Sequence, residues 1–353
     1  MAHLTTQNVK IVGVSACVPK TIEENIELPL YEDKEEARKI IESTGIKRHR
    51  IVEKGTTASD LSVKAAEKMV ADLGWDMQSV DLLLYSCTTR DYIQPMTSPI
   101  IQDKLGMRQD SFVMDLPLGC AGWVYGMSVA TALMNSGTLK RGLLIAAETN
   151  TQSHNLNDRK SRPLFGDAAT VTALEFDADY PHPMNFVFGV DGSGAKAIMA
   201  EYGGFRNPVT PESLVEHEIE PGVFRKGTDI VLNGMDVFSF AIRRPPKSLK
   251  ELIELFHIQL EDIDYLFLHQ ANKYIDDRIR KSIKFPEEKT PYCMDDFGNV
   301  SGASIPLTMV TRAAEQLSQK ENHCLACGFG VGLSWASMEF WTNHLKISEL
   351  VEY

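Results

Sequence analysis

Two stretches of the chain repeat each other: Leu73-Gly-Trp-Asp-Met-Gln-Ser-Val-Asp-Leu-Leu-Leu-Tyr-Ser-Cys87 and Phe256-His-Ile-Gln-Leu-Glu-Asp-Ile-Asp-Tyr-Leu-Phe-Leu-His-Gln270. In each copy an amphipathic helix ends, a short polar link follows, and an aspartate precedes a buried strand. We expect the two helices over residues 60–73 and 248–256. A helix followed by a strand at equivalent points predicts a chain built from two related halves.

A second pair of matching segments follows in the same order. Gly119-Cys120 and a helix expected at residues 121–134 match Gly298-Asn299 and a helix expected at residues 304–317. In both copies a strand turns sharply into a helix. Cys120 and Asn299 therefore occupy equivalent turns.

A third pair consists of the strands expected at residues 141–148 and 322–329. Three pairs in one order predict an α/β fold of two pseudo-symmetric half-domains, residues 1–180 and 181–353, with mixed or mostly parallel sheets covered by helices. Residues 200–231 are rich in Gly, Pro, Glu and Asn, and we expect them to be an insertion in the second half.

Cys120 stands where an apolar strand-like run, residues 111–118, turns into a small-residue helix. At the first turn of a helix, free backbone N–H groups and the positive end of the dipole stabilise a thiolate, which is the nucleophilic form. The alternative is a small buried core residue. Because Asn299 lies on the equivalent turn, we expect a site where the halves meet.

The composition excludes several classes of protein. The chain has 353 residues, of which 43% are hydrophobic and 24% charged, and a net charge of −12 that argues against general nucleic-acid binding. No stretch approaches the roughly 20 apolar residues of a membrane span, and the first residues lack a secretory apolar region, so we expect a cytoplasmic protein. Six cysteines do not form a disulfide framework. Cys324-Leu-Ala-Cys327 lies in an apolar run without a second ligand pair, so we expect no metal.

Four motifs occur in order along the chain: Leu118-Gly-Cys120-Ala-Gly, Leu268-His269-Gln-Ala-Asn272, Phe297-Gly-Asn299-Val-Ser-Gly-Ala-Ser304-Ile-Pro306 and Gly328-Phe-Gly-Val-Gly-Leu-Ser-Trp335. Together they resemble the thiolase-type condensing enzymes, and specifically the ketoacyl-ACP synthase III (KAS III) branch. The resemblance covers nearly the whole chain. It implies a five-layered αβαβα fold and a homodimer.

The resemblance also implies a role for each motif. Cys120 would take an acyl group from a thioester, and His269 and Asn299 would hold the thioester carbonyl of a malonyl-type substrate while carbon dioxide leaves. Neutral imidazole and the amide would both act as donors to the developing oxyanion. Backbone N–H groups of Cys120 and Val331 would form a second oxyanion site. The substrates would be acyl-CoA or acyl-carrier-protein thioesters, with no further cofactor.

The sequence departs from the family at the positions that recognise the carrier. Lys39 and Ser43 stand where many members have a Trp and an Arg that contact coenzyme A, and Tyr274 replaces a basic docking residue. Candidate basic residues for docking coenzyme A or an acidic carrier protein are Arg243, Arg278, Arg280 and Lys281.

Three functional hypotheses follow from these residues. The first is decarboxylative condensation of an acyl thioester with a malonyl-type thioester, in fatty-acid initiation or in specialised fatty-acid or polyketide-type synthesis. The second keeps the acyl-Cys120 intermediate but passes the acyl group to an alcohol, amine or other acceptor, with His269 as general base. The third is a non-catalytic partner subunit. The acyl chain, its carrier and the pathway stay open.

Overall fold

The computed structural model describes all of residues 1–353, and its main strands form one mixed sheet assembly. The strand order is β1-β9-β16-β2-β8-β7-β5-β6, with β15 also pairing β16 and β14 pairing β15. The strands of this assembly are β1 (Ala2–Thr6), β2 (Val9–Val18), β5 (Leu82–Ser86), β6 (Phe112–Leu116), β7 (Arg141–Thr149), β8 (Asp167–Phe176), β9 (Met184–Val190), β14 (Tyr265–Leu268), β15 (Glu321–Gly330), β16 (Ser334–Ile347) and β17 (Val351–Glu352).

The strand pairing confirms the internal repeat. In the first half β5 and β7 are parallel, whereas β8 is antiparallel to both β7 and β2. In the second half β14 and β15 are parallel, whereas β16 is antiparallel to both β15 and β9. The halves differ at one edge, where β6 extends the first sheet beyond β5. The second half has the short helix α8 (Met294–Phe297) in the corresponding stretch of chain.

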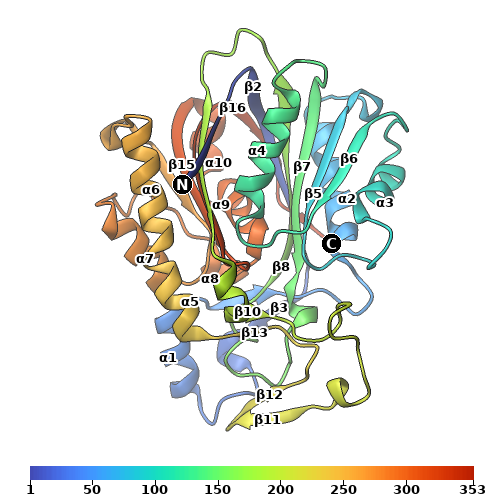
Figure 1. The fold of residues 1–353 in the computed structure, drawn as a ribbon, viewed down its shortest axis with the longest axis vertical. Helices are drawn as coiled ribbons and strands as arrows, with labels where there is room; N and C mark the ends of the chain where they lie inside the picture. The colour runs from blue at the N-terminus through green and yellow to red at the C-terminus, as the bar shows by residue number, and fades with distance from the viewer.

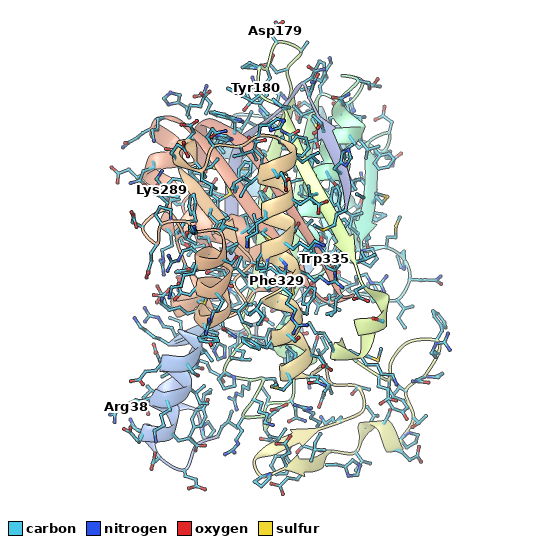
Figure 2. All side chains as sticks on the ribbon, turned by 60° about the vertical axis from the view of Figure 1, so that its left-hand side comes forward. Arg38, Asp179, Tyr180, Lys289, Phe329 and Trp335 are labelled. Carbon is cyan, nitrogen blue, oxygen red and sulfur yellow. The ribbon has the colours of Figure 1, made fainter.

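The two halves are joined through parallel pairing of β2 and β16. The chain ends also cross between them, because β1 pairs with β9 and β17 pairs with β2. Tyr180, where we placed the boundary, lies on the loop between β8 and β9 at the upper end of the molecule, far from Arg38 at the lower end (Figure 2). The division at residue 180 stays a prediction.

Helices cover the two parts of the sheet in five layers, as expected (Figure 1). Helix α2 packs on the outer face of β2, β7 and β8, and α6 on the outer face of β9 and β16. Helices α4 and α9 lie between the two parts, because α4 contacts β5 and β15 and α9 contacts β2 and β14. The helices are α1 (Lys34–Thr44), α2 (Ala58–Asp72), α3 (Thr97–Leu105), α4 (Gly122–Met134), α5 (Gly234–Ala241), α6 (Arg244–Leu255), α7 (Lys273–Ser282), α9 (Ser304–Arg312) and α10 (Ala314–Gln319).

Three apolar cores correspond to these layers. The central core joins Trp123 of α4 with Leu307 of α9 and Phe340 of β16. The two outer cores lie beneath α2 and α6, around Met69 and Leu252 respectively. The central helices are therefore held on both sides, which fixes the turns at their N-terminal ends.

Most predicted helices are confirmed, with two differences. Helix α6 begins four residues before the expected start, because Pro245 and Pro246 lie in its first turn, where the missing N–H has no intrahelical partner to lose. The single helix expected at residues 304–317 is broken at Ala313, whose φ of −126° is not helical. No helix is both long and apolar enough to cross a membrane.

Residues 200–231, which we expected to be an insertion, form a set of short elements at the lower end of the molecule (Figure 1). The antiparallel pair β10 (Ile198–Met199) and β13 (Val231–Leu232) closes its base. Within it, β11 (His217–Glu220) and β12 (Val223–Arg225) form a hairpin. Arg225 pairs with the buried carboxylate of Asp158 at 2.9 Å, which ties the insertion to the segment after β7. A further antiparallel pair, β3 (Ile22–Glu24) and β4 (Arg48–Arg50), flanks α1 in the chain.

Candidate active site

Cys120 lies on the turn between β6 and α4, directly before the N-cap residue Ala121. Its side chain lines a cavity of about 1820 Å³. The strand β15 passes very close to it, because a Cβ built on Gly330 would lie 2.6 Å from the Cys120 sulfur. A side chain at residue 330 would therefore collide with Cys120.

The surroundings of Cys120 correct the expected thiolate-stabilising helix start. Burial raises the pKa of the thiol, and hydrogen bonds from the Ser301 hydroxyl and the Val331 N–H oppose this only in part. The Ser301 Oγ to Cys120 Sγ distance is 3.6 Å. The thiol is thus the resting form, and a base would have to accept its proton before the sulfur could act as a nucleophile.

His269 follows β14 and is held in one orientation. Its backbone N–H donates to the carbonyl of Cys327 at 2.9 Å. Its imidazole Nδ1 lies 3.2 Å from the Ser301 carbonyl and 3.0 Å from Ser304 Oγ. Because the carbonyl oxygen only accepts, Nδ1 carries the proton of the neutral ring and Nε2 has the lone pair. Burial lowers the pKa of His269 to about 4, so the ring is neutral at pH 7.

Asn299 lies on the turn before α9 and is held by hydrogen bonds to both its backbone and its side chain. Its backbone N–H donates to Leu164 at 2.7 Å, and its Oδ1 accepts the Ser301 N–H at 2.9 Å. The Nδ2 group is therefore the end of the amide left for a ligand. Asn299 and His269 both line the same cavity as Cys120, so the structure brings the three predicted residues together.

Comparison with known proteins agrees with this geometry. Residues 114–192 match the family model of 3-oxoacyl-[acyl-carrier-protein (ACP)] synthase III, and residues 254–340 match the model of its C-terminal part. Beta-ketoacyl-[acyl-carrier-protein] synthase III of Streptococcus agalactiae is 33% identical over 331 residues, covering 93% of this chain and 98% of the relative. The chain belongs to the 3-oxoacyl-[acyl-carrier-protein] synthase III family.

Solved structures of this family have the same fold. The crystal structure of a 3-oxoacyl-(acyl-carrier protein) synthase from Burkholderia xenovorans LB400 matches with a TM-score of 0.93 at 31% identity, over 100% of this chain and 99% of that one. The priming beta-ketosynthase of the R1128 polyketide pathway matches with a TM-score of 0.80 at 26% identity, over 97% and 98% of the two chains. The protein is a KAS III-like condensing enzyme, an acyltransferase of thiolase-like fold.

Sequence reasoning missed a buried carboxylate, Glu148, whose charge acts on Cys120. Glu148, near the end of β7, accepts the N–H and hydroxyl groups of both Thr88 and Thr89 at 2.7 to 3.0 Å. Burial raises the pKa of Glu148, while these four hydrogen bonds oppose the increase. The third repeat pair ends at this glutamate, but the pattern gave no sign of its hydrogen-bond partners.

Two of the candidate docking residues are placed differently from one another. Arg278 is exposed on α7, where its guanidinium lies 2.8 Å from the Tyr274 hydroxyl. Arg280, on the same helix, is only 7% exposed and lies against Asp277 and Glu287 at 3.2 and 3.0 Å. Arg280 is therefore a structural cation that holds α7 in place, and we remove it from the docking set.

Arg243 and Lys281 are both exposed, as a docking role requires. Arg243 is the N-cap residue of α6, and Lys281 lies in the last turn of α7. The two residues are on neighbouring helices, since α6 packs against α7.

Proposed function

We propose that this synthase loads an acyl group from a thioester onto Cys120 and condenses it, with loss of carbon dioxide, with a malonyl-type thioester. The observation that carries the proposal is the convergence of Cys120, His269 and Asn299 on one cavity in a chain of this family. Each of the three side chains has one face fixed by protein and one face left for a substrate.

In the acylation step His269 is the base. The Cys120 thiol gives its proton to Nε2, and the sulfur attacks the thioester carbonyl carbon. The N–H groups of Cys120 and Val331 stabilise the resulting oxyanion, in keeping with the Val331 N–H beside the sulfur. The leaving thiolate departs with the proton from His269, which returns the ring to its neutral form.

In the condensation step the malonyl carboxylate leaves as carbon dioxide, and its bonding electrons form an enolate. Asn299 Nδ2 donates to the enolate oxygen. His269 donates from Nε2 only when protonated, because Nδ1 is held by Ser301 and Ser304. Acylation leaves the ring neutral with its only proton on Nδ1, so the neutral imidazole is not the donor that we expected. The proton that condensation consumes is therefore taken up from solvent onto Nε2. The enolate carbon attacks the acyl carbonyl, the carbon–sulfur bond to Cys120 breaks, and the sulfur receives that proton.

Several features support finer expectations. The outer edge of β6 has no strand partner in this chain and Phe112 is 41% exposed, so a second copy pairing there would form the expected homodimer. Exposed Arg243, Arg278 and Lys281 suit an acidic acyl carrier protein or the phosphates of coenzyme A. All six cysteines are free thiols, in keeping with the expected cytoplasmic location. The acyl thioesters need no metal or organic cofactor for this chemistry.

Intact-protein mass measurement after incubation with acyl-CoA and acyl-carrier thioesters tests the proposal. We expect an acyl adduct on the wild-type protein and none on Cys120→Ala, followed by adduct loss and carbon dioxide release when a malonyl thioester is added. Adduct loss to an alcohol or amine without carbon dioxide supports the alternative acyl transfer. No adduct with any donor supports a non-catalytic subunit and overturns the proposal.

A further inference from the structure

Glu148 is a buried carboxylate that the proposed chemistry does not use. It is only 1% exposed, and no cationic side chain forms an ion pair with it. Glutamate is almost never fully buried in a protein unless it is paired. Four hydrogen bonds take the place of a cation here, because Oε1 accepts the N–H and hydroxyl of Thr88 and Oε2 accepts those of Thr89. The carboxylate therefore fixes both the backbone and the side chains of these two threonines.

These hydrogen bonds determine where the two hydroxyl groups point. Thr88 Oγ1 lies 2.9 Å and Thr89 Oγ1 2.7 Å from the oxygens of buried Glu148. Thr89 Oγ1 also accepts the Thr149 N–H at 2.9 Å, so its own hydrogen is free to go to the carboxylate. Both threonines line the cavity, and Thr88 is exposed. Because its oxygen is turned inward, the methyl group is the part of the Thr88 side chain left for the cavity.

The Thr88 methyl lies beside the turn that carries Cys120. A Cβ built on Gly119 would be 3.6 Å from Thr88 Cγ2, and 3.1 and 3.2 Å from Ser301 Oγ and Val331 Cγ1. The Ser301 hydroxyl and the Val331 N–H are the groups that form hydrogen bonds with the Cys120 sulfur. The methyl therefore belongs to the wall that surrounds an acyl group on Cys120.

An acyl group on Cys120 has to be kept from water until the second substrate arrives. The His269 ring is neutral, so Nε2 can accept a proton from a water molecule as well as from the thiol. Water would attack the acyl carbonyl carbon, the carbon–sulfur bond would break, and the proton on Nε2 would pass to the sulfur, which releases a free acid. A hydroxyl that faces the cavity can hold such a water by a hydrogen bond, whereas a methyl group cannot. An apolar wall beside Cys120 therefore protects the intermediate.

We propose that Glu148 is a positioning residue that turns the Thr88 hydroxyl away from the cavity, so that the acyl group on Cys120 meets a methyl group and resists hydrolysis. This inference rests on the proposed function, because it concerns the lifetime of the acyl-enzyme. Without the carboxylate, the Thr88 hydroxyl would lose its buried partner and would turn toward the cavity, where water can satisfy it.

The lifetime of the acyl-enzyme without a malonyl thioester tests the inference. Protein is loaded with hexanoyl-CoA, or with the donor that gives the largest adduct, and the excess donor is removed by gel filtration. Loss of the Cys120 adduct is followed by intact mass in water enriched in heavy oxygen, which labels the acid that hydrolysis releases. Glu148→Met removes both acceptor oxygens at similar length, and we expect its adduct to disappear about tenfold faster than that of the wild type.

A second substitution identifies the group responsible. Thr88→Val in the Glu148→Met background replaces the released hydroxyl with a methyl group, so the lifetime should return to within about threefold of the wild-type value. A role of Glu148 in stability alone would not be rescued in this way. Glu254→Met, at an exposed glutamate of α6, is the control and should keep the wild-type lifetime. Thermal unfolding checks that each variant is folded.

Substitutions of Thr88 alone keep the test decisive if Glu148→Met does not fold. Thr88→Val retains a methyl group on the cavity wall, whereas Thr88→Ser removes it and leaves space for water. We expect the Thr88→Ser adduct to be lost about threefold or more faster than the Thr88→Val adduct.

The outcomes separate this inference from the function beneath it. A wild-type lifetime in Glu148→Met, a rapid loss that Thr88→Val does not reverse, or equal lifetimes of Thr88→Ser and Thr88→Val overturns the inference and leaves the proposed function intact. Rapid loss without heavy oxygen in the released acid overturns it as well, because water would not be the attacking group. No adduct from any donor overturns the proposed function itself.

Discussion

Ser301 Oγ lies 3.6 Å from Cys120 Sγ, and the backbone of Ser301 also holds the other two residues of the site. Its carbonyl is 3.2 Å from His269 Nδ1, and its N–H donates to Asn299 Oδ1 at 2.9 Å. One residue therefore links Cys120, His269 and Asn299. Its φ of 53° lies in the left-handed region, so the surrounding turn maintains an uncommon conformation.

Ser301→Ala should slow acylation without disturbing the orientation of His269 and Asn299. The substitution removes only the hydroxyl that opposes the high pKa of Cys120, while the backbone contacts remain. We expect a loss of about tenfold in the rate of adduct formation, corresponding to about 1.4 kcal/mol, and a shift of the pH–rate profile to higher pH. Single-turnover acylation followed by mass measures both.

Ser136→Ala, at an exposed serine after α4, is the matched control and should acylate at the wild-type rate. An unchanged pH–rate profile in Ser301→Ala would show that the hydroxyl does not act on the thiol.

Gly330→Ala should abolish acylation because of the close approach of β15 to the nucleophile. The new Cβ would lie 2.6 Å from both Cβ and Sγ of Cys120, so the turn must move. We expect at least a hundredfold loss of adduct formation and a destabilisation of about 1–3 kcal/mol in urea unfolding. Gly204→Ala, where a Cβ meets nothing within 4 Å, should change neither quantity. Normal acylation of Gly330→Ala would mean that the turn has room that the structure does not show.

The sequence predicted those parts of the site that depend on local pattern and repetition. The equivalent turns of Cys120 and Asn299 followed from the repeat, and β14 places His269 beside them. The pKa of Cys120 was predicted in the wrong direction, because the burial that raises it depends on the close approach of β15, whose Gly330 comes about 210 residues later in the chain. Ser301 lies two residues after Asn299 in the same motif, but only the folded turn reveals its contacts.

The sequence did not predict a special position for Asn150, for a different reason. A polar residue after a strand is common, and the sequence does not show that the amide of this one is buried without a hydrogen-bond partner. Only the assembled cavity shows that its Nδ2 is buried and unpaired. The same holds for Arg280, whose burial against Asp277 no charge pattern on α7 reveals.

Buried His154 should make the stability of the synthase depend on pH. Burial lowers the pKa of His154 to about 4, although Asp158 and Asp229 oppose the decrease. Between about pH 6.5 and 4 the unfolded chain binds more protons than the native protein, so the native state loses stability as pH falls through this window. Above about pH 6.5 this stabilising contribution is complete.

His154→Asn removes that titration, so the variant should lose less stability than the wild type on acidification. The difference should be about 1.4 kcal/mol per pH unit within the window, measured by urea unfolding at several pH values. His3→Asn, at an exposed position, serves as the control and should follow the wild type. Parallel stability curves for His154→Asn and the wild type would contradict a neutral, buried imidazole at this position.

The two arginines of α7 should respond to substitution in opposite ways. Exposed Arg278 together with Lys281, both changed to Glu, should raise the KM for a carrier-bound malonyl thioester about tenfold or more at low salt, with the stability within about 0.5 kcal/mol of wild type. Arg280→Ala leaves Asp277 and the Phe285 carbonyl without their shared donor, so it should destabilise the protein by about 2–4 kcal/mol. Its KM for the carrier should stay near the wild-type value in the fraction that folds. Steady-state kinetics at two salt concentrations and urea unfolding distinguish the two effects, and a selective KM increase in Arg280→Ala would return that residue to the docking surface.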